Sequence, residues 1–175
     1  MTKYVAFLRA VNVGKRTIKM EDLRQQLETA GFKEVTTYIQ SGNVMFSSAN
    51  SNDTTLAHKI EKLLQAAYGF EVPTIIRSVS ALETVVQQSP FPGVIPDKER
   101  QIYITFLSTP TSQAEKVISE LQSNAETLYL GKREVYTMIN KKLEKKPLDV
   151  IIKLEKKLGI PCTTRNWATV NKVIW

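Results

Sequence analysis

A small group of polar side chains near the N-terminus has the types needed to hold an anion. Arg9 and Asn12 lie where the first predicted strand ends, and the other members crowd the turn of a later predicted hairpin. The hairpin members are Gln40, Ser41 and Asn43. Guanidinium, amide and hydroxyl groups all donate hydrogen bonds, and a guanidinium adds charge. No carboxylate is placed by spacing beside a plausible partner, so the sequence predicts a ligand site and leaves catalytic residues unknown.

The loop that follows the first strand strengthens this prediction. Gly14, Lys15 and Arg16 lie between a predicted strand and a predicted helix. Loops in that position commonly hold anions through backbone N–H groups. The segment lacks two features of a nucleotide-binding phosphate loop: a glycine five residues before the Gly-Lys pair and a hydroxyl directly after Lys15. The alternative is structural, with Asn12 and Gly14 shaping the turn and both cations solvated.

The hairpin group also has a structural alternative, because Gly42 and Asn43 suit a tight turn. That alternative does not require Gln40 or Ser41. A further cation and amide, Arg165 and Asn166, precede Trp167 near the C-terminus. We include Arg165 and Asn166 in the predicted ligand-binding set. For this pair the alternative is that Asn166 is a helix N-cap and Trp167 packs in the core.

Cysteine and histidine chemistry is not expected. Cys162 is the only cysteine and His58 the only histidine. An intrachain disulfide and the common zinc ligand sets are therefore excluded. A nucleophilic Cys162 would need a nearby base, and His58 falls on the polar face of its predicted helix. We expect both residues to be ordinary, and we expect no cofactor and no metal site.

Hydrophobic periodicity and glycine positions predict the elements of the first half. Residues 20–30 carry an apolar helical stripe, and Gly31 stands where a left-handed C-terminal cap is wanted, with Phe32 folding back on Leu27. Asp53 is a plausible N-cap for a second helix, and Ser80 for a short helix that follows the last strand. The predicted strands are residues 5–11, 35–39, 44–47 and 72–77. The order is β-α-β-β-α-β, the ferredoxin-like pattern.

The second half repeats this order. The predicted strands are residues 101–107, 127–130, 134–139 and 161–164, and the predicted helices are 112–122, 147–158 and 166–174. Pro147 suits the first turn of its helix, on which Leu148, Ile151, Leu154 and Leu158 are expected to face inward. We therefore predict an α+β fold with two tandem ferredoxin-like (α-β plait) subdomains and a C-terminal helix. The predicted divisions are residues 1–90, a proline-rich linker at 91–100, and residues 101–175; an exchange of strands between the halves is left open.

Charge is unevenly distributed along the chain. The protein has 24 basic and 17 acidic residues, a formal net charge of +7. Residues 132–157 are rich in lysine, which is typical of a solvated helix face but would also attract polyanions such as nucleic acid. An RNA-binding sheet would need several exposed aromatic residues, and the third strand offers only Phe46. No apolar run approaches the length that spans a bilayer, so we expect a cytoplasmic protein without membrane contact; the oligomeric state is not predicted.

The candidate residues lie within a recognisable pattern. The matching pieces are Phe7-Leu8-Arg9, Asn12-Val13-Gly14, Ile18-Lys19-Met20, Leu23, Gly31-Phe32, the run from Thr37 to Val44 and the run from Thr164 to Val170. In this combination the chain resembles the bacterial family catalogued as domain of unknown function 1697. The resemblance implies two α-β plait subdomains and no activity. The family usually has Gly-Ile where Ala10-Val11 stand and a second glycine where Lys15 stands.

The leading hypothesis is therefore a binding protein for a small anionic or phosphorylated ligand. The residues predicted to hold this ligand are Arg9, Asn12, Lys15, Gln40, Ser41, Asn43, Arg165 and Asn166. Two alternatives remain open at this point: a nucleic-acid-binding module that uses the basic second half, and an enzyme of unknown reaction.

Overall fold

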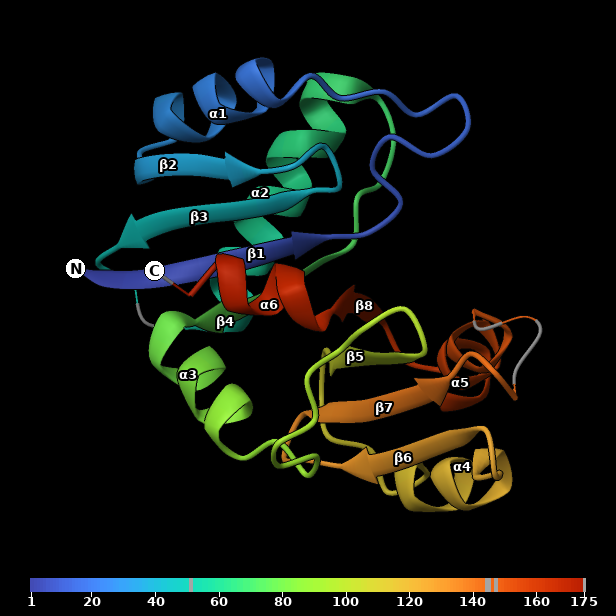
Figure 1. The fold of residues 1–175 in the computed structure, drawn as a ribbon. Coiled ribbons are helices and arrows are strands. Elements are labelled where there is room, and N and C mark those ends of the chain that lie inside the picture. Colours follow the sequence, from blue (N-terminus) through green and yellow to red (C-terminus); the bar gives the residue numbers. More distant parts are fainter. Residues whose placement is uncertain (51, 144–145, 147, 175) are drawn as a thin grey trace. The chain divides into compact units, whose positions relative to one another are not determined.

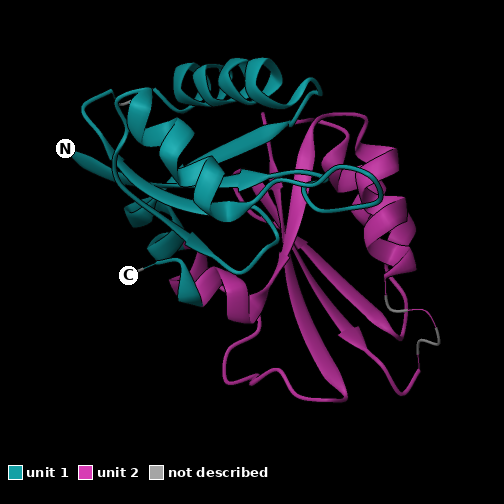
Figure 2. Cartoon of the chain, turned by 90° about the horizontal axis from the view of Figure 1, so that it is seen from above, with its two compact units in different colours: residues 1–84, 172–175 teal, residues 85–171 magenta. Residues whose placement is uncertain are grey.

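The chain forms two compact units (Figure 2), each built on its own four-stranded antiparallel sheet. The structure is a computed structural model that describes residues 1–50, 52–143, 146 and 148–174. Unit 1 comprises residues 1–84 and 172–175, and unit 2 comprises residues 85–171. The domain boundaries predicted from the sequence stay a prediction.

Unit 1 has the expected β-α-β-β-α-β order (Figure 1). Its elements are β1 (Thr2–Leu8), α1 (Met20–Thr29), β2 (Lys33–Tyr38), β3 (Asn43–Ser48), α2 (Asp53–Tyr68) and β4 (Thr74–Ser78), followed by α3 (Val79–Gln87). The strand order in the sheet is β2-β3-β1-β4, so β1 and β3 are central neighbours. They are antiparallel, with Phe7 opposite Asn43. The end of β1 therefore lies beside the start of β3.

The core of unit 1 lies between one face of the sheet and helices α1 and α2. Alternate residues of the central strands, such as Ala6 and Leu8 of β1 and Val44 of β3, join Leu23 and Leu27 of α1 in this core. The alternation follows from the two-residue period of a strand, and the four-residue spacing in α1 follows from the helical repeat.

The end of α1 confirms the predicted glycine cap. Gly31 has φ +93°, its N–H donates to Glu28 O at 3.0 Å, and the N–H of Phe32 donates to Leu27 O at 3.1 Å. These two bonds make a Schellman motif, and Phe32 and Leu27 share the core cluster as the motif requires.

Two predicted N-caps were wrong by one or two residues. Asn52, not Asp53, caps α2, because its side chain accepts a hydrogen bond from the N–H of Thr55 at 2.8 Å. Ser78, not Ser80, caps α3, since its Oγ accepts from the N–H of Ala81 at 3.2 Å. In both places two cap-forming residue types stand close together.

Unit 2 repeats the topology of unit 1. Its elements are β5 (Arg100–Leu107), α4 (Ala114–Leu121), β6 (Glu126–Leu130), β7 (Glu134–Asn140), α5 (Asp149–Leu158) and β8 (Cys162–Asn166), followed by α6 (Trp167–Lys172). The sheet order is β6-β7-β5-β8. Each sheet thus draws all its strands from one half of the chain. The predicted fold class, two βαββαβ units with a C-terminal helix, is confirmed.

The core of unit 2 includes Ile151, Leu154 and Leu158 of α5, as expected. The prediction for Leu148 was wrong: the residue is 56% exposed. The described helix begins at Asp149, one residue beyond it. The predicted role of Pro147 falls outside the described residues. No helix in the described part of the chain combines the length and the apolar character needed to cross a membrane.

Candidate functional site

The candidate site lies at one end of the unit 1 sheet, where the loop between β1 and α1 meets the turn between β2 and β3 (Figure 1). Backbone hydrogen bonds set this meeting point. The N–H of Leu8 donates to Gly42 O at 2.8 Å, and the N–H of Arg9 donates to Pro73 O at 2.9 Å. The start of the loop is therefore hydrogen-bonded on both sides, to the β2–β3 turn on one side and to the residue before β4 on the other.

Asn12 links the loop to the hairpin. Its Nδ2 donates to Gln40 O at 2.8 Å, and its Oδ1 accepts from the N–H of Ile18 at 2.8 Å. The side chain thus uses donor and acceptor at once, and it closes the loop from residue 12 to residue 18. Asn12 itself has φ +58°, a conformation that asparagine tolerates better than most residues.

The buried side chain of Asn43 forms hydrogen bonds across the turn between β2 and β3. Its side chain is fully buried, and its Nδ2 donates to Tyr38 O at 3.1 Å and to Ser41 Oγ at 2.9 Å. A buried amide needs such partners, since an unsatisfied donor costs free energy. The structure thus brings Asn12, Asn43 and the turn at Gln40 and Ser41 into one network.

Gly42 is the point of closest approach between hairpin and loop. A Cβ placed on Gly42 would lie 2.8 Å from Leu8 Cβ, 3.2 Å from Leu8 O and 3.4 Å from Val11 Cβ. Its φ of +76° also favours glycine. Only glycine allows the two segments to pack at this distance without a shift.

The loop carries the charge of the site. Arg9 is half-buried, whereas Lys15, Arg16 and Lys19 are exposed. Gly14 and Lys15 form a two-residue turn, in which the N–H of Arg16 donates to Val13 O at 3.3 Å. The Arg16 guanidinium lies over the Phe70 ring, 5.3 Å from its centre, an arrangement that favours the cation. Residues 9–19 and 39–43 contain no carboxylate.

Backbone strain also gathers here. Four non-glycine residues with positive φ occur among the described residues, and three of them are Ala10 (+56°), Asn12 (+58°) and Ile39 (+50°). Alanine and isoleucine have no local hydrogen bond to offset this conformation. Sequence reasoning missed both. The available signal for Ala10 was that the family usually has glycine there.

The remaining predicted members, Arg165 and Asn166, belong to unit 2. The Nη1 of Arg165 donates to Thr163 Oγ1 at 2.8 Å and to Thr164 O at 2.9 Å. Burial lowers the pKa of the Arg165 guanidinium to about 10, and the Glu155 carboxylate opposes that shift. Asn166 is the N-cap predicted as the alternative role, since its Oδ1 accepts from the N–H of Thr169 at 2.8 Å.

The residues considered for cysteine and histidine chemistry differ in their exposure. Cys162 is buried and is the only cysteine of the sequence, and His58 is exposed. No group of three or more His, Cys, Asp or Glu side chains within the described ranges is arranged to hold a metal ion.

Two features bear on nucleic-acid binding: the aromatic residues of the unit 1 sheet and the basic segment at residues 132–157. Tyr4 and Phe46 stack in the helix-covered core of unit 1, with ring centres 5.7 Å apart, so neither ring is presented on the opposite sheet face. In the basic segment at 132–157, Lys153, Lys156 and Lys157 are exposed as expected. Lys142 and Lys157 form ion pairs with Glu99 and Glu120, at 2.8 and 2.7 Å, which offset part of the local charge. Lys145 lies outside the described residues.

Comparison with known proteins agrees with this fold. The chain is similar in structure to the conserved bacterial protein SP0830 from Streptococcus pneumoniae, with a TM-score of 0.82 and 26% sequence identity over 99% of this chain and 97% of that chain. Comparison with curated proteins finds no match. The family model described as "Protein of unknown function (DUF1697)" matches residues 1–136. Because that match covers most of the sequence, the chain belongs to the DUF1697 family.

Proposed function

We propose that the loop and hairpin end of unit 1, residues 9–19 with 39–43, binds a small anionic or phosphorylated ligand. The ligand would lie against Arg9 and Lys15 of the loop and Gln40 and Ser41 of the hairpin. Asn12 and Asn43 would hold the frame, because their amides already join loop to hairpin and close the turn.

A comparison of the two units carries this proposal. In unit 2 the corresponding bonds run from the N–H of Leu107 to Arg133 O and from the N–H of Ser108 to Pro161 O, both at 2.9 Å. Glu134 pairs with Phe106 there, as Asn43 pairs with Phe7 in unit 1. Both side chains are buried and complete the turn of their hairpin, Glu134 by accepting from the N–H groups of Lys132 and Arg133 at 3.2 Å.

The two ends nevertheless differ in charge. The unit 2 hairpin contains its own carboxylate, whereas the unit 1 hairpin has a neutral amide at the same position. The connection that follows the first strand is short in unit 2, residues 108–113, and has no basic residue. In unit 1 it is longer, residues 9–19, and has four. A loop rich in basic residues attracts anions by its local potential.

The strained backbone supports the same conclusion. Residues with unfavourable backbone dihedrals cost of order 1–3 kcal/mol each and tend to cluster at ligand sites. Ala10 lies in the loop of this end, and Ile39 is the first residue of its hairpin segment. Left-handed residues also turn backbone N–H groups toward one side, as anion-binding nests do.

Thermal unfolding in phosphate or sulfate tests the proposal, with chloride at the same ionic strength as reference. Binding to the folded state stabilises it by RT ln(1 + [L]/Kd), about 2.7 kcal/mol when the anion is at a hundred times its Kd. Phosphate and sulfate also stabilise proteins generally, by exclusion from the surface. The quantity to compare is therefore the anion-dependent increase in melting temperature of each variant and of the wild type, because the increase of the wild type alone does not separate binding from exclusion.

Arg9→Ala and Lys15→Ala should each lose most of the anion-dependent increment while remaining folded. Lys132→Ala is the matched control, since Lys132 is an exposed cation at the corresponding hairpin of unit 2. It should keep the full increment. Equal increments in the wild type and in both loop variants would leave a purely structural network at this end.

A further inference from the structure

A pocket lies at the opposite end of unit 2 from its β6–β7 hairpin. It has a volume of about 500 Å³ and is lined where β5 begins and where β7 and β8 end. The lining includes Pro96, Lys98, Gln101, Lys141, Asn166 and Trp167. Volumes of this order suit a small organic ligand. All of the lining belongs to unit 2.

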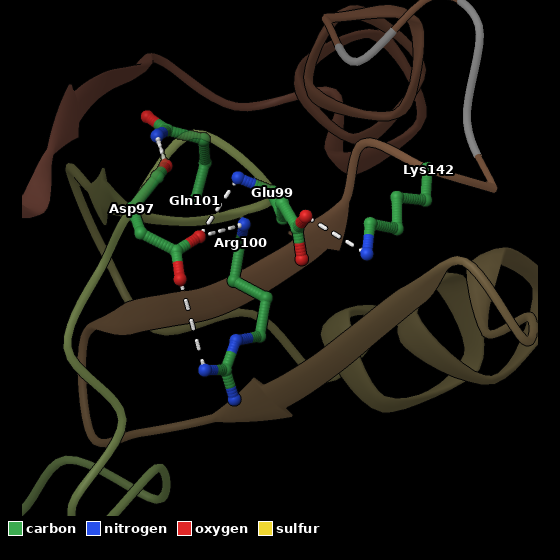
Figure 3. A network of polar contacts seen from close by, with 5 residues as sticks. All are labelled: Asp97, Glu99, Arg100, Gln101 and Lys142. Carbon is green, nitrogen blue, oxygen red and sulfur yellow. Dashed lines mark hydrogen bonds and ion pairs between the residues drawn. The ribbon is translucent and has the colours of Figure 1, made fainter.

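One wall is an ordered turn in which Asp97, the only carboxylate among the described lining residues, already accepts hydrogen bonds (Figure 3). The Asp97 Oδ1 accepts from the N–H groups of Glu99 and Arg100, each at 2.7 Å, and its Oδ2 lies 3.7 Å from the Arg100 guanidinium. Gln101 in turn donates from its side chain to Asp97 O. The bonds to the carboxylate, led by that from the N–H of Arg100 and followed by that from the N–H of Glu99, lower the pKa of the Asp97 carboxyl. The wall is therefore fixed, and its negative charge is engaged within the turn.

The cations of the pocket differ from their neighbour Lys142. Lys142 forms an ion pair with Glu99 at 2.8 Å (Figure 3). Lys98 and Lys141 are exposed and line the pocket, and neither forms an ion pair with any residue that the structure describes. The pocket thus carries two uncompensated ammonium groups beside an engaged carboxylate.

The third element is the Trp167 indole. Trp167 is half-buried at the start of α6, and its carbonyl accepts from Asn171 Nδ2 at 2.8 Å. The Asn166 cap fixes the same turn. Within the described ranges no other ring stacks on Trp167. An indole on a turn with a fixed backbone, without an internal ring partner and in a pocket with two cations, suits a flat aromatic group that bears a phosphate.

We propose that this pocket binds a nucleotide, with the base on Trp167 and the phosphate near Lys98 and Lys141. Base–aromatic stacking tolerates every base, because each has a π face. The ammonium groups add a salt-dependent attraction for the phosphate. A free mononucleotide and one nucleotide of a single strand share this chemistry. The proposal is independent of the anion site of unit 1.

Tryptophan fluorescence provides the test, in a Trp175→Phe background that leaves Trp167 as the only indole. The probes are the 5′-monophosphates of adenosine, guanosine, cytidine and uridine, with adenosine and inorganic phosphate as partial ligands. A monophosphate should quench the fluorescence saturably, and each partial ligand should bind at least about tenfold more weakly, because it makes only one of the two contacts. Absence of saturable quenching with all four monophosphates up to millimolar concentration would overturn the proposal.

Variants assign the binding to this pocket. In calorimetric titrations Trp167→Ala should weaken binding about 5- to 150-fold, the range set by base stacking. The double variant Lys98→Ala with Lys141→Ala should weaken it at least about tenfold and flatten its salt dependence. Lys142→Ala, the matched control next in sequence, should change affinity less than about twofold, because its ammonium is paired with Glu99.

If Trp167→Ala fails to fold by circular dichroism, the lysine double variant decides alone, and unchanged affinity in it overturns the proposal. A single-stranded hexanucleotide that binds more than about tenfold tighter than the mononucleotide assigns the site to a strand, and similar affinities assign it to the free nucleotide.

Discussion

Replacing Gly42 by alanine tests the tight contact that positions the candidate site of unit 1. The substitution has two separable costs. Gly42 has φ +76°, and a left-handed conformation costs an L-residue about 1–2 kcal/mol. Alanine also lowers the conformational entropy of the unfolded chain, which stabilises the folded state by about 0.4–1 kcal/mol. At the middle of both ranges, the conformational part of the change is therefore a loss of about 0.5–1 kcal/mol.

Steric overlap adds a second cost at this position alone. The new Cβ would lie 2.8 Å from Leu8 Cβ and 3.2 Å from Leu8 O. Leu8 O is a backbone atom of a buried central strand, and Leu8 Cβ is bonded directly to that backbone. Neither atom can move away by a change of side-chain rotamer. Overpacking of this kind costs about 1–3 kcal/mol. We expect Gly42→Ala to destabilise unit 1 by about 1.5–4 kcal/mol in total.

Gly31→Ala is the matched control. Gly31 also has positive φ, +93°, but a Cβ there meets no atom within 4 Å. It should lose only the conformational part, about 0.5–1 kcal/mol. Urea denaturation followed by circular dichroism gives the two midpoints at a common m-value. Hydrogen exchange of the Leu8 amide, which donates to Gly42 O, reports on unit 1 itself. If Gly42→Ala and Gly31→Ala lose the same stability within error, the contact between hairpin and β1 is not tight and our account of the site geometry fails.

Three further predictions concern single residues. Ala10→Gly should stabilise the protein by up to about 1 kcal/mol in the same denaturation assay, because glycine removes the left-handed strain at φ +56°. Asn52→Ala should cost about 1 kcal/mol by removing the cap of α2, and Asp53→Ala should cost clearly less; the reverse order would restore Asp53 as the cap. Tyr136→Phe should cost about 1 kcal/mol, because the buried hydroxyl donates to Val85 O at 2.9 Å. Burial, with a smaller contribution from Glu134, raises the pKa of Tyr136 above its ordinary value of 10, so the folded state keeps this proton longer than the unfolded state. That contribution to stability is complete below pH 10 and is lost as the pH rises beyond it; Tyr136→Phe should therefore show a shallower alkaline decrease in unfolding midpoint.

The element order was predictable because local signals agree with one another. Helical stripes, strand-forming runs and the glycines at 31, 69 and 159 mark the same boundaries, and these three glycines have positive φ in the structure. Exact helix starts were less predictable. Asn52 and Asp53 both suit an N-cap, and the sequence alone does not decide which side chain reaches the backbone. Leu148 has the spacing of an inward residue, but α5 begins beyond it.

For the candidate site, the sequence predicted only that the loop after β1 and the β2–β3 hairpin lie close together. Strand topology brings the end of β1 beside the start of β3 in any fold of this type. The individual bonds need the folded backbone: nothing in the sequence says that Asn12 reaches Gln40 O across 28 positions. The left-handed conformations of Ala10 and Ile39 contradict the preference of their residue types, so residue preferences alone do not predict them.

The repeat within the chain separates what the fold requires from what function adds. A buried polar residue at the start of the third strand is present in both units, as Asn43 and as Glu134, and each completes its own turn. That feature is therefore a requirement of this hairpin and is no evidence of binding. The long cationic loop at residues 9–19 and its strained Ala10 have no equivalent at residues 108–113, and unit 2 folds without them. Since the same topology is stable in their absence, the charge and the strain of unit 1 are the features that folding alone does not explain.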